Sequence, residues 1–333
     1  MKPLQLSLLS KFRKELMGIS AIMILICHIP GNGIRMPKVL EYVLAQGQIG
    51  VDIFLFLSGM GLWYSLSKSS VISGGGVKYW YINRYTKILV PYIIIQGVMT
   101  AVRCYEDDSL GLLFWISSVS TVEFWLSHRA AWFIALLLPL YLIAPWLYRF
   151  FKSKVALKFT ALIIAVYLIG LLPLDWIEMK VDNNNILYNI QFALWRVPSF
   201  IFGMYMAPYI KQNRKMKKAW LIPMLIAAVC MLVLTRHSVH AYLFLVLPVM
   251  YVLAMIFHSE TGLFNKLCRF YGQISLESYL WNGLSIVFIP LMAWLGIPDY
   301  NNMVMYSLVI LCGTLLSVGV SKMKRPIIAK LTK

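Results

Sequence analysis

Long apolar runs recur along the whole chain and restrict its fold more than any other feature. Ala161–Leu172 and Leu221–Leu234, with their flanks, each approach the roughly 20 residues that an α-helix needs to cross ~30 Å of hydrocarbon. Of the 333 residues, 60% are apolar and 13% are charged, whereas soluble domains carry about 25% charged residues. The sequence therefore predicts an all-α, polytopic integral membrane protein with a single transmembrane domain over residues 1–333.

Ten spanning helices fit this pattern and leave no room for a soluble domain. A further segment, Leu110–Leu126, is almost apolar enough to span, but it carries several serine or threonine residues and Glu123. We expect it to form an interfacial or re-entrant helix on the outer side. The expected spans lie near residues 15–30, 49–68, 83–103, 130–150, 156–173, 190–210, 218–235, 239–257, 273–294 and 303–322.

The distribution of lysine and arginine predicts the orientation of these spans. With the N-terminus inside, the inner segments and adjoining span ends hold 24 of the 31 lysine and arginine residues, whereas the outer segments hold most of the acids. This is the positive-inside pattern, so we expect both termini in the cytoplasm. The net charge of +18 thus resides in short loops between spans, which argues against a nucleic-acid partner.

The five cysteines are dispersed and show no CxxC or Cys/His spacing, so we expect neither a disulfide framework nor a metal site. They are Cys27, Cys104, Cys230, Cys268 and Cys312.

Ionisable residues within spans are costly and mark candidate functional sites. His28 and Asp52 are expected at similar depth near the outer boundary, where a carboxylate beside an imidazole would favour a general base. Arg196 is expected about 9 Å into the sixth span, where it needs a partner or a polar cavity and could bind an anionic or hydroxyl-rich substrate. Trp132, at the outer start of the fourth span, is a second candidate for substrate binding.

A different set of charges is expected at the inner end. Arg84 and Lys87 lie one turn apart and share a helix face, so they either anchor the third span or clamp a phosphorylated cytosolic ligand. Glu277 is expected about 6 Å into the ninth span from the inner side, at a depth where it could pair with this clamp.

At these positions the chain resembles the membrane acyltransferase 3 family, the O-acyltransferases of bacterial envelopes. Six segments follow the order of the family motifs over nearly the whole chain, and the second is the most specific. The segments are Glu15-Leu-Met-Gly-Ile-Ser-Ala followed by Cys27-His28, Gly50-Val-Asp-Ile-Phe-Leu-Phe-Leu-Ser-Gly59, Arg84-Tyr-Thr-Lys87-Ile-Leu-Val-Pro-Tyr92, Ala131-Trp-Phe-Ile134, Arg196-Val-Pro-Ser-Phe-Ile-Phe-Gly203 and Ile274-Ser-Leu-Glu-Ser-Tyr-Leu-Trp281.

The chain departs from the family pattern at three positions. Met17 stands where the family has an arginine eleven residues before the histidine, and Arg13 or Lys14 could substitute from one turn away. Lys87 replaces the second arginine of the pair and loses its bidentate geometry. Asn282 stands where a histidine is common after the Tyr-Leu of the late span.

The resemblance implies that His28 and Asp52 are catalytic, and that Arg84, Lys87 and Glu277 bind a cytosolic acyl-CoA, commonly acetyl-CoA. It also implies that Arg196, Trp132 and Asn282 bind the acceptor, a carbohydrate or glycolipid hydroxyl. The expected location is the bacterial cytoplasmic membrane, with polysaccharide-assembly proteins as possible partners. Two alternatives stay open: a transporter or substrate-binding module, for example for amino-acid uptake, which Met17 and Asn282 would fit, and a structural partner in a polysaccharide-assembly complex.

Overall fold

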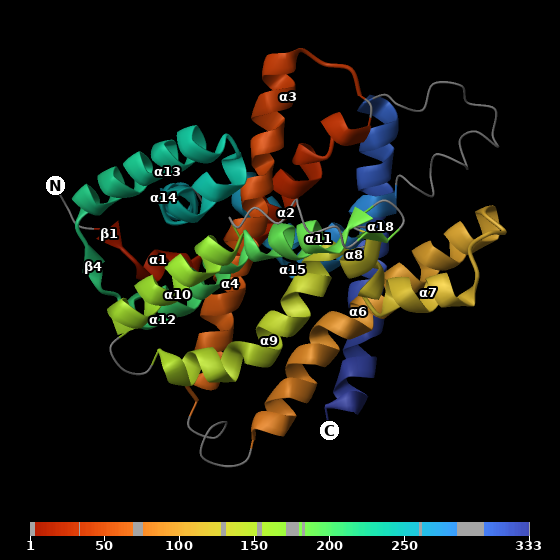
Figure 1. Ribbon diagram of the computed structural model, residues 1–333, viewed down its shortest axis with the longest axis horizontal. Coiled ribbons are helices and arrows are strands. Elements are labelled where there is room, and N and C mark those ends of the chain that lie inside the picture. The colour runs from red at the N-terminus through yellow and green to blue at the C-terminus, as the bar shows by residue number, and fades with distance from the viewer. Residues whose placement is uncertain are drawn as a thin grey trace.

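The structure, a computed structural model, describes residues 4–32, 34–68, 76–127, 131–151, 155–170, 180–181, 184–259, 262–284 and 303–332. These residues form a bundle of helices with two pairs of very short antiparallel strands, β1 with β4 and β2 with β3 (Figure 1). In chain order the elements are β1 (Leu4–Gln5), α1 (Ser7–Lys11), α2 (Arg13–Cys27), η1 (Pro30–Asn32), α3 (Lys38–Ala45), η2 (Gln46–Gln48), α4 (Ile49–Leu66), α6 (Val77–Glu106), α7 (Leu112–Val119), α8 (Val122–Ser127), α9 (Trp132–Phe150), α10 (Val155–Gly170), β2 (Lys180–Val181), β3 (Asn184–Asn185), α11 (Ile186–Leu194), α12 (Val197–Lys211), β4 (Lys215–Met216), η3 (Lys218–Trp220), α13 (Leu221–Thr235), α14 (Ser238–Ser259), α15 (Leu263–Gln273), α16 (Ser275–Leu280), η4 (Trp281–Leu284) and α18 (Met303–Leu331).

Six helices in the described part of the chain are long and apolar enough to cross a membrane. They are the continuous segment Lys38–Leu66, α6, α9, the segment Lys218–Thr235, α14 and α18. This result confirms an all-α protein with several membrane-spanning helices. The number of ten spans stays a prediction, because the other four expected spans contain only shorter helices. Two of them correspond to α2 and α10, and a third corresponds to the pair α11 and α12. The fourth begins with α16 and η4, and residues 285–302, which follow, lie outside the described part.

Two regions differ from a simple series of spans. The segment expected to be one helix over 190–210 is divided at Arg196, because Pro198 in the first turn of α12 has no N–H to continue a preceding helix. The segment 110–126 forms α7 and α8, which meet at Thr121 with a φ of 68°. Helices of 8 and 6 residues are too short to span, as expected for this segment.

The segments expected on the inner side gather at one end of the molecule. The N-terminal strand β1 pairs with β4 in the lysine-rich loop after α12. The Tyr79 hydroxyl, near the start of α6, donates to the carbonyl of Thr332 at the C-terminal end over 2.7 Å. Lys211 contacts Ser67 across the ends of α12 and α4. The chain thus brings these segments together, and the assignment of this end to the cytoplasm is a prediction from its lysine and arginine content.

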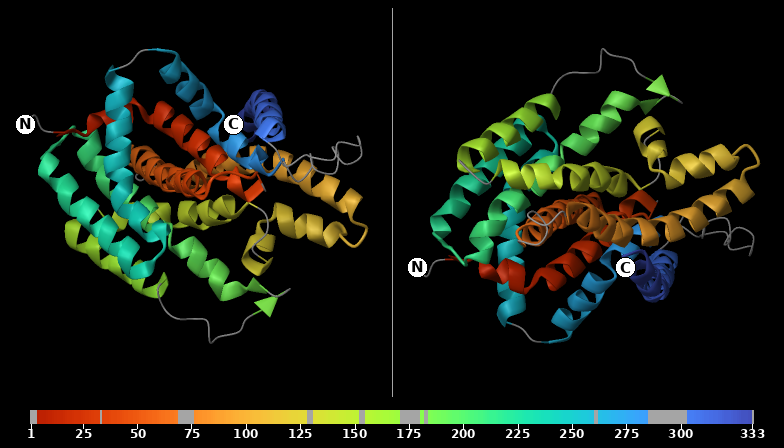
Figure 2. Two further views of the ribbon diagram at one scale, coloured as in Figure 1. Left: turned by 90° about the horizontal axis from the view of Figure 1, so that it is seen from above. Right: turned by 90° about the horizontal axis from the view of Figure 1, so that it is seen from below.

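Helix α4 lies inside the bundle, surrounded by α2, α9, α12 and α14 (Figures 1 and 2). It is apolar on all sides, as is typical of a buried helix. Its closest neighbour is α12, since a Cβ atom on Gly59 would collide with the backbone of Phe200, and one on Gly203 would collide with the backbone of Phe56. These two glycines let the helix backbones touch, and the contact fixes α4 against the first two turns of α12.

Candidate active site

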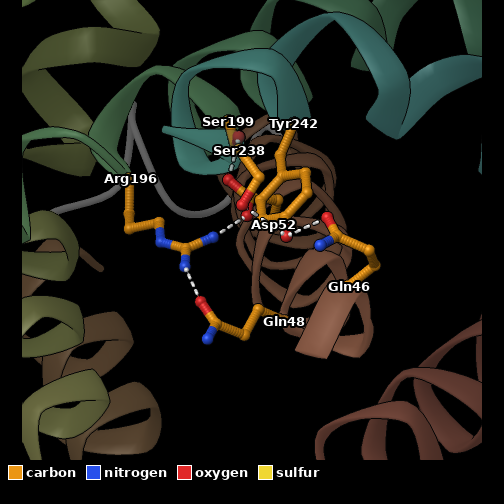
Figure 3. Close-up of polar contacts among 7 residues, drawn as sticks. All are labelled: Gln46, Gln48, Asp52, Arg196, Ser199, Ser238 and Tyr242. Atoms are coloured by element: carbon orange, nitrogen blue, oxygen red, sulfur yellow. Dashed lines mark hydrogen bonds and ion pairs between the residues drawn. The ribbon is translucent and has the colours of Figure 1, made fainter. Parts of the chain in front are cut away.

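Asp52 and Arg196 form a buried ion pair between α4 and the first residue before α12 (Figure 3). Their side chains are 1% and 2% exposed, so both charges are removed from solvent. The other carboxylate oxygen of Asp52 accepts a hydrogen bond of 2.7 Å from the Ser199 hydroxyl. The partner that an arginine at this depth requires is therefore Asp52. From the sequence, Asp52 was instead expected to lie beside His28.

The guanidinium group of Arg196 has three further neighbours, one amide and two aromatic rings. Its second nitrogen, Nη2, donates to Gln48 Oε1 over 3.3 Å. The rings of Trp132 and Tyr242 flank it, with centroids 6.0 and 5.4 Å from the guanidinium carbon. Such aromatic faces stabilise a cation without neutralising it. Trp132 thus lies beside Arg196, as its role as a substrate-binding candidate requires.

A second set of hydrogen bonds lies beside this pair, at Tyr242, whose ring contacts the guanidinium group of Arg196 (Figure 3). The Tyr242 hydroxyl lies 3.0 Å from Gln46 Oε1 and 3.1 Å from the Ser238 hydroxyl. These contacts connect α14 with the turn that precedes α4. The network therefore joins three segments that are far apart in the sequence around one buried charge pair.

His28 directly follows the last residue of α2, as its C-cap, and its side chain is exposed. Its Nδ1 lies 2.8 Å from the carbonyl of Ile24, one turn earlier, and 3.3 Å from the Cys27 thiol. A hydrogen bond from Nδ1 to a backbone carbonyl favours the tautomer in which Nε2 carries the lone pair. The imidazole can therefore act as a base through Nε2, with its tautomer selected by the backbone.

His28 and Asp52 occupy neighbouring helix ends, because α2 packs along α4, and Cys27 lies within electrostatic range of Arg196. The carboxylate oxygens of Asp52 bond to Arg196 and Ser199, whereas the contacts described for His28 are with its own helix. Asp52 is thus the partner of Arg196. The tautomer of His28, which Asp52 was expected to select, is instead selected by the backbone carbonyl of Ile24.

The opposite end of the bundle carries a group of cations that includes Arg84 and Lys87 of α6. Arg13, at the start of α2, interacts electrostatically with Arg84, and both approach the hydroxyl of Tyr141. Lys87 is exposed and lies within range of Arg84. In the described ranges, no carboxylate forms an ion pair with any of these three cations. Cations without acidic partners are the arrangement that an anionic ligand requires.

Of the two cations one turn before Met17, Arg13 and not Lys14 lies inside the bundle. The Lys14 side chain is exposed, whereas the Arg13 guanidinium lies against α4 and donates to the carbonyl of Leu57 over 3.3 Å. Arg13 Nε is buried without a hydrogen-bond partner among the described residues. Gly61 gives the guanidinium its space, since a Cβ there would lie 2.9 Å from Arg13 Nη2.

Glu277 does not pair with the cationic group, contrary to the expectation from its depth. It is 1% exposed and forms an ion pair with Lys324 of α18. The position of a residue along its span predicts its depth in the membrane but not which neighbouring helix its side chain faces. In the structure, Glu277 on α16 faces α18. A second ion pair at this end joins Glu15 of α2 to Arg269 of α15 over 2.6 Å.

Asn282 lies apart from the contacts of Arg196 that the structure describes. It belongs to η4 and lines a small cavity of about 10 Å³ together with Leu25 and Tyr306. A role for Asn282 in acceptor binding therefore stays a prediction.

Sequence reasoning missed several members of both sites. Ser199 is one turn after Arg196 within the same motif, so a search for hydroxyls on the same helix face could have found it. Gln48, Tyr242 and Lys324 carry no comparable signal, because each is placed by tertiary packing. Within the described residues, no group of three or more histidine, cysteine or acidic side chains could hold a metal ion.

Comparison with known proteins places these sites in a family. The model of the acyltransferase domain that defines the acyltransferase 3 family matches residues 16–322. This range contains His28, Asp52, Arg84, Arg196 and Glu277, and it leaves Arg13 just outside. No curated protein and no solved structure matches the chain. Since the family match covers nearly the whole chain, this multi-pass membrane protein belongs to the acyltransferase 3 family.

Proposed function

We propose that the protein is an O-acyltransferase that moves an acyl group, in the first instance acetyl, from cytosolic acyl-CoA to a hydroxyl of an envelope carbohydrate or glycolipid. Its location would be the bacterial cytoplasmic membrane. The observation that carries the proposal is the chemical difference between the two ends of the bundle. One end has cations for which the described residues provide no acidic partner, and the other has an exposed histidine at the end of α2 and a buried arginine that is paired with Asp52.

The cationic end suits the donor. Coenzyme A carries several phosphate charges, and arginine binds phosphate through a planar fork of donors. Arg13 and Arg84 lie within electrostatic range of each other, neither forms an ion pair with a carboxylate of the described residues, and Lys87 adds an exposed charge nearby. The positive charges of Arg13 and Arg84 repel each other. A bound phosphate group would relieve this repulsion and accept charge-assisted hydrogen bonds from both guanidinium groups.

The opposite end suits the acceptor. His28 Nε2 would remove the proton from an acceptor hydroxyl, whose oxygen then attacks the carbonyl carbon of the thioester. When the tetrahedral intermediate collapses, the carbon–sulfur bond breaks and the leaving thiolate takes the proton back from the imidazolium. Every proton is thus accounted for without a further reactant.

Arg196 would bind the acceptor or stabilise the oxyanion, and Asp52 would act as a positioning residue. Asp52 and Gln48 fix two nitrogens of the guanidinium, while Trp132 and Tyr242 hold its faces. A donor held in this way is preorganised for charge that develops in a transition state.

Acyl transfer by purified protein in liposomes tests the proposal directly. Labelled acetyl-CoA and an envelope glycan fraction are supplied, and the product is identified by the mass of one added acetyl group. Replacing His28 with Ala should reduce the rate by about 10²–10⁴-fold without loss of folded protein, because the side chain is exposed. His258→Ala is the control, since this exposed histidine lies in the last turn of α14, whereas Tyr242 beside Arg196 lies in the first turns. Undiminished transfer by His28→Ala would overturn the assignment of the base.

A further inference from the structure

A partly open cavity of about 100 Å³ lies between the two polar ends of the bundle. Its walls come from α2, α4, α6, α9 and α16, and they are mostly apolar. Met17, Phe54, Phe133 and Leu137 provide much of this surface, and the hydroxyl-bearing side chains include Tyr141 and Tyr279. A mostly apolar cavity of this size among packed helices requires an explanation because protein interiors are otherwise close-packed.

The two tyrosines connect the cavity to both functional ends. Tyr141 lines it and also interacts with the guanidinium groups of Arg13 and Arg84. Tyr279 lines it as well and lies within electrostatic range of Cys27, the neighbour of His28. The cavity therefore lies on the way from the proposed donor site to the proposed base.

Aromatic contacts extend the same connection to the arginine. The Phe133 ring lies 5.2 Å from the ring of Tyr279 and 6.0 Å from the ring of Trp132. Trp132 in turn flanks the guanidinium of Arg196. A group held against Phe133 is thus one side chain away from the Asp52–Arg196 pair.

The volume limits what the cavity can hold. An engineered apolar cavity of about 150 Å³ accepts benzene, so the present cavity has room for roughly four non-hydrogen atoms. An acetyl thioester has this size and is mainly apolar. We infer that the cavity binds the acyl end of the donor and makes the enzyme selective for short chains, with Leu137 and Phe54 as the residues that limit chain length. This inference rests on the proposed function.

An enlarged cavity tests the inference, because a gain of activity cannot result from misfolding. Leu137→Ala removes a side chain that is 4% exposed from the cavity wall. We expect it to raise the rate with butyryl-CoA relative to acetyl-CoA by at least about 10-fold, the usual effect of methylene groups in an apolar pocket. Leu140→Ala is the matched control: it is 3% exposed, lies one turn further along α9 and does not line the cavity.

A filling variant provides the converse measurement. Met17→Phe adds volume where the side chain is only partly buried, and it should lower the rate with propionyl-CoA more than the rate with acetyl-CoA. If no acyl-CoA of any length supports transfer by the wild-type protein, the proposed function fails. If acyl-CoA supports transfer but Leu137→Ala, Phe54→Ala and Met17→Phe leave the chain-length preference of the wild type unchanged, the cavity inference alone is wrong.

Discussion

Asp52 and Arg196 are 144 residues apart in the sequence and form a buried ion pair at the level where α12 begins. Two turns further along both helices, Gly59 and Gly203 form the closest backbone contact between α4 and α12. The two helices therefore run in the same direction, as expected of two spans that both start on the outer side. The most specific motif and the arginine motif thus form one structural unit.

Removing either partner of this ion pair should destabilise the protein. Asp52→Ala leaves a buried guanidinium without its counter-charge, which costs about 3–5 kcal/mol. Arg196→Ala likewise leaves the buried carboxylate of Asp52 without its counter-charge. The loss of stability in the double variant should be smaller than the sum of the losses in the two single variants. Thermal unfolding in detergent measures all three variants. Ser199→Ala, which removes one hydrogen bond to the same carboxylate, should cost only about 1 kcal/mol, and strictly additive losses would contradict the pairing.

Replacing the two arginines of the cationic end should weaken donor binding. Arg13→Gln and Arg84→Gln each remove charge-assisted hydrogen bonds, so the Kd for CoA should rise by about 10–100-fold. Lys14→Gln is the control, because this neighbouring lysine is exposed. The measurement is the CoA-dependent shift in unfolding temperature.

The same measurement separates the enzyme from a transporter built on this fold. Wild-type protein that shows no shift with CoA, together with an Arg13→Gln/Arg84→Gln variant that behaves like the wild type, would favour transport. Addition of salt should weaken CoA binding to the wild type, since exposed charges such as Lys87 are screened within about 10 Å at 0.1 M ionic strength.

Substituting the glycines between α4 and α12 should separate the helices. Gly59→Ala and Gly203→Ala each place a Cβ against backbone atoms that cannot move alone, and overpacking of this kind costs about 1–3 kcal/mol. Gly319→Ala in α18 is the control, because the added Cβ would meet no atom within 4 Å among the described residues beyond the backbone of its own helix. It should leave the unfolding temperature unchanged or raise it. Equal unfolding temperatures for Gly59→Ala and Gly319→Ala would argue against the close contact.

The ion pair between Glu277 and Lys324 predicts a structural role for the glutamate. Glu277→Gln and Lys324→Gln should lower the unfolding temperature by non-additive amounts, while the CoA-dependent shift is retained. A Glu277→Gln variant that unfolds like the wild type but no longer responds to CoA would instead place this glutamate in the donor site.

The fold class and the candidate site residues could be predicted because each depends on the local sequence, without knowledge of which helices pack together. Apolar runs identify spanning helices, and a buried arginine such as Arg196 requires a partner wherever it lies. The break before α12 was harder to predict, because Pro198 occurs in an apolar stretch that is otherwise suitable for one continuous span. A proline in a membrane helix often causes only a kink, so the packing around Arg196 decides the outcome here.

The pairing of the charges could not be predicted in full. A rise of 1.5 Å per residue gives the height of Asp52 and Glu277 within the bundle, but not the direction in which each side chain points. Asp52 was expected to orient His28 and instead bonds to Arg196, and Glu277 faces Lys324. Helix rotation is fixed by contacts such as those of Gly59 and Gly203, which a single sequence does not reveal.

Helix α12 begins inside the protein, since Arg196, Val197 and Ser199 are all buried. The aligned peptide dipoles of a helix place about half a positive charge at its N-terminus. Asp52 therefore faces both a full guanidinium charge and this partial charge, and it neutralises only about two-thirds of their sum. The surplus positive potential needs no additional cationic side chain, and it would favour the negative oxygen of a tetrahedral intermediate over the neutral carbonyl from which that oxygen forms.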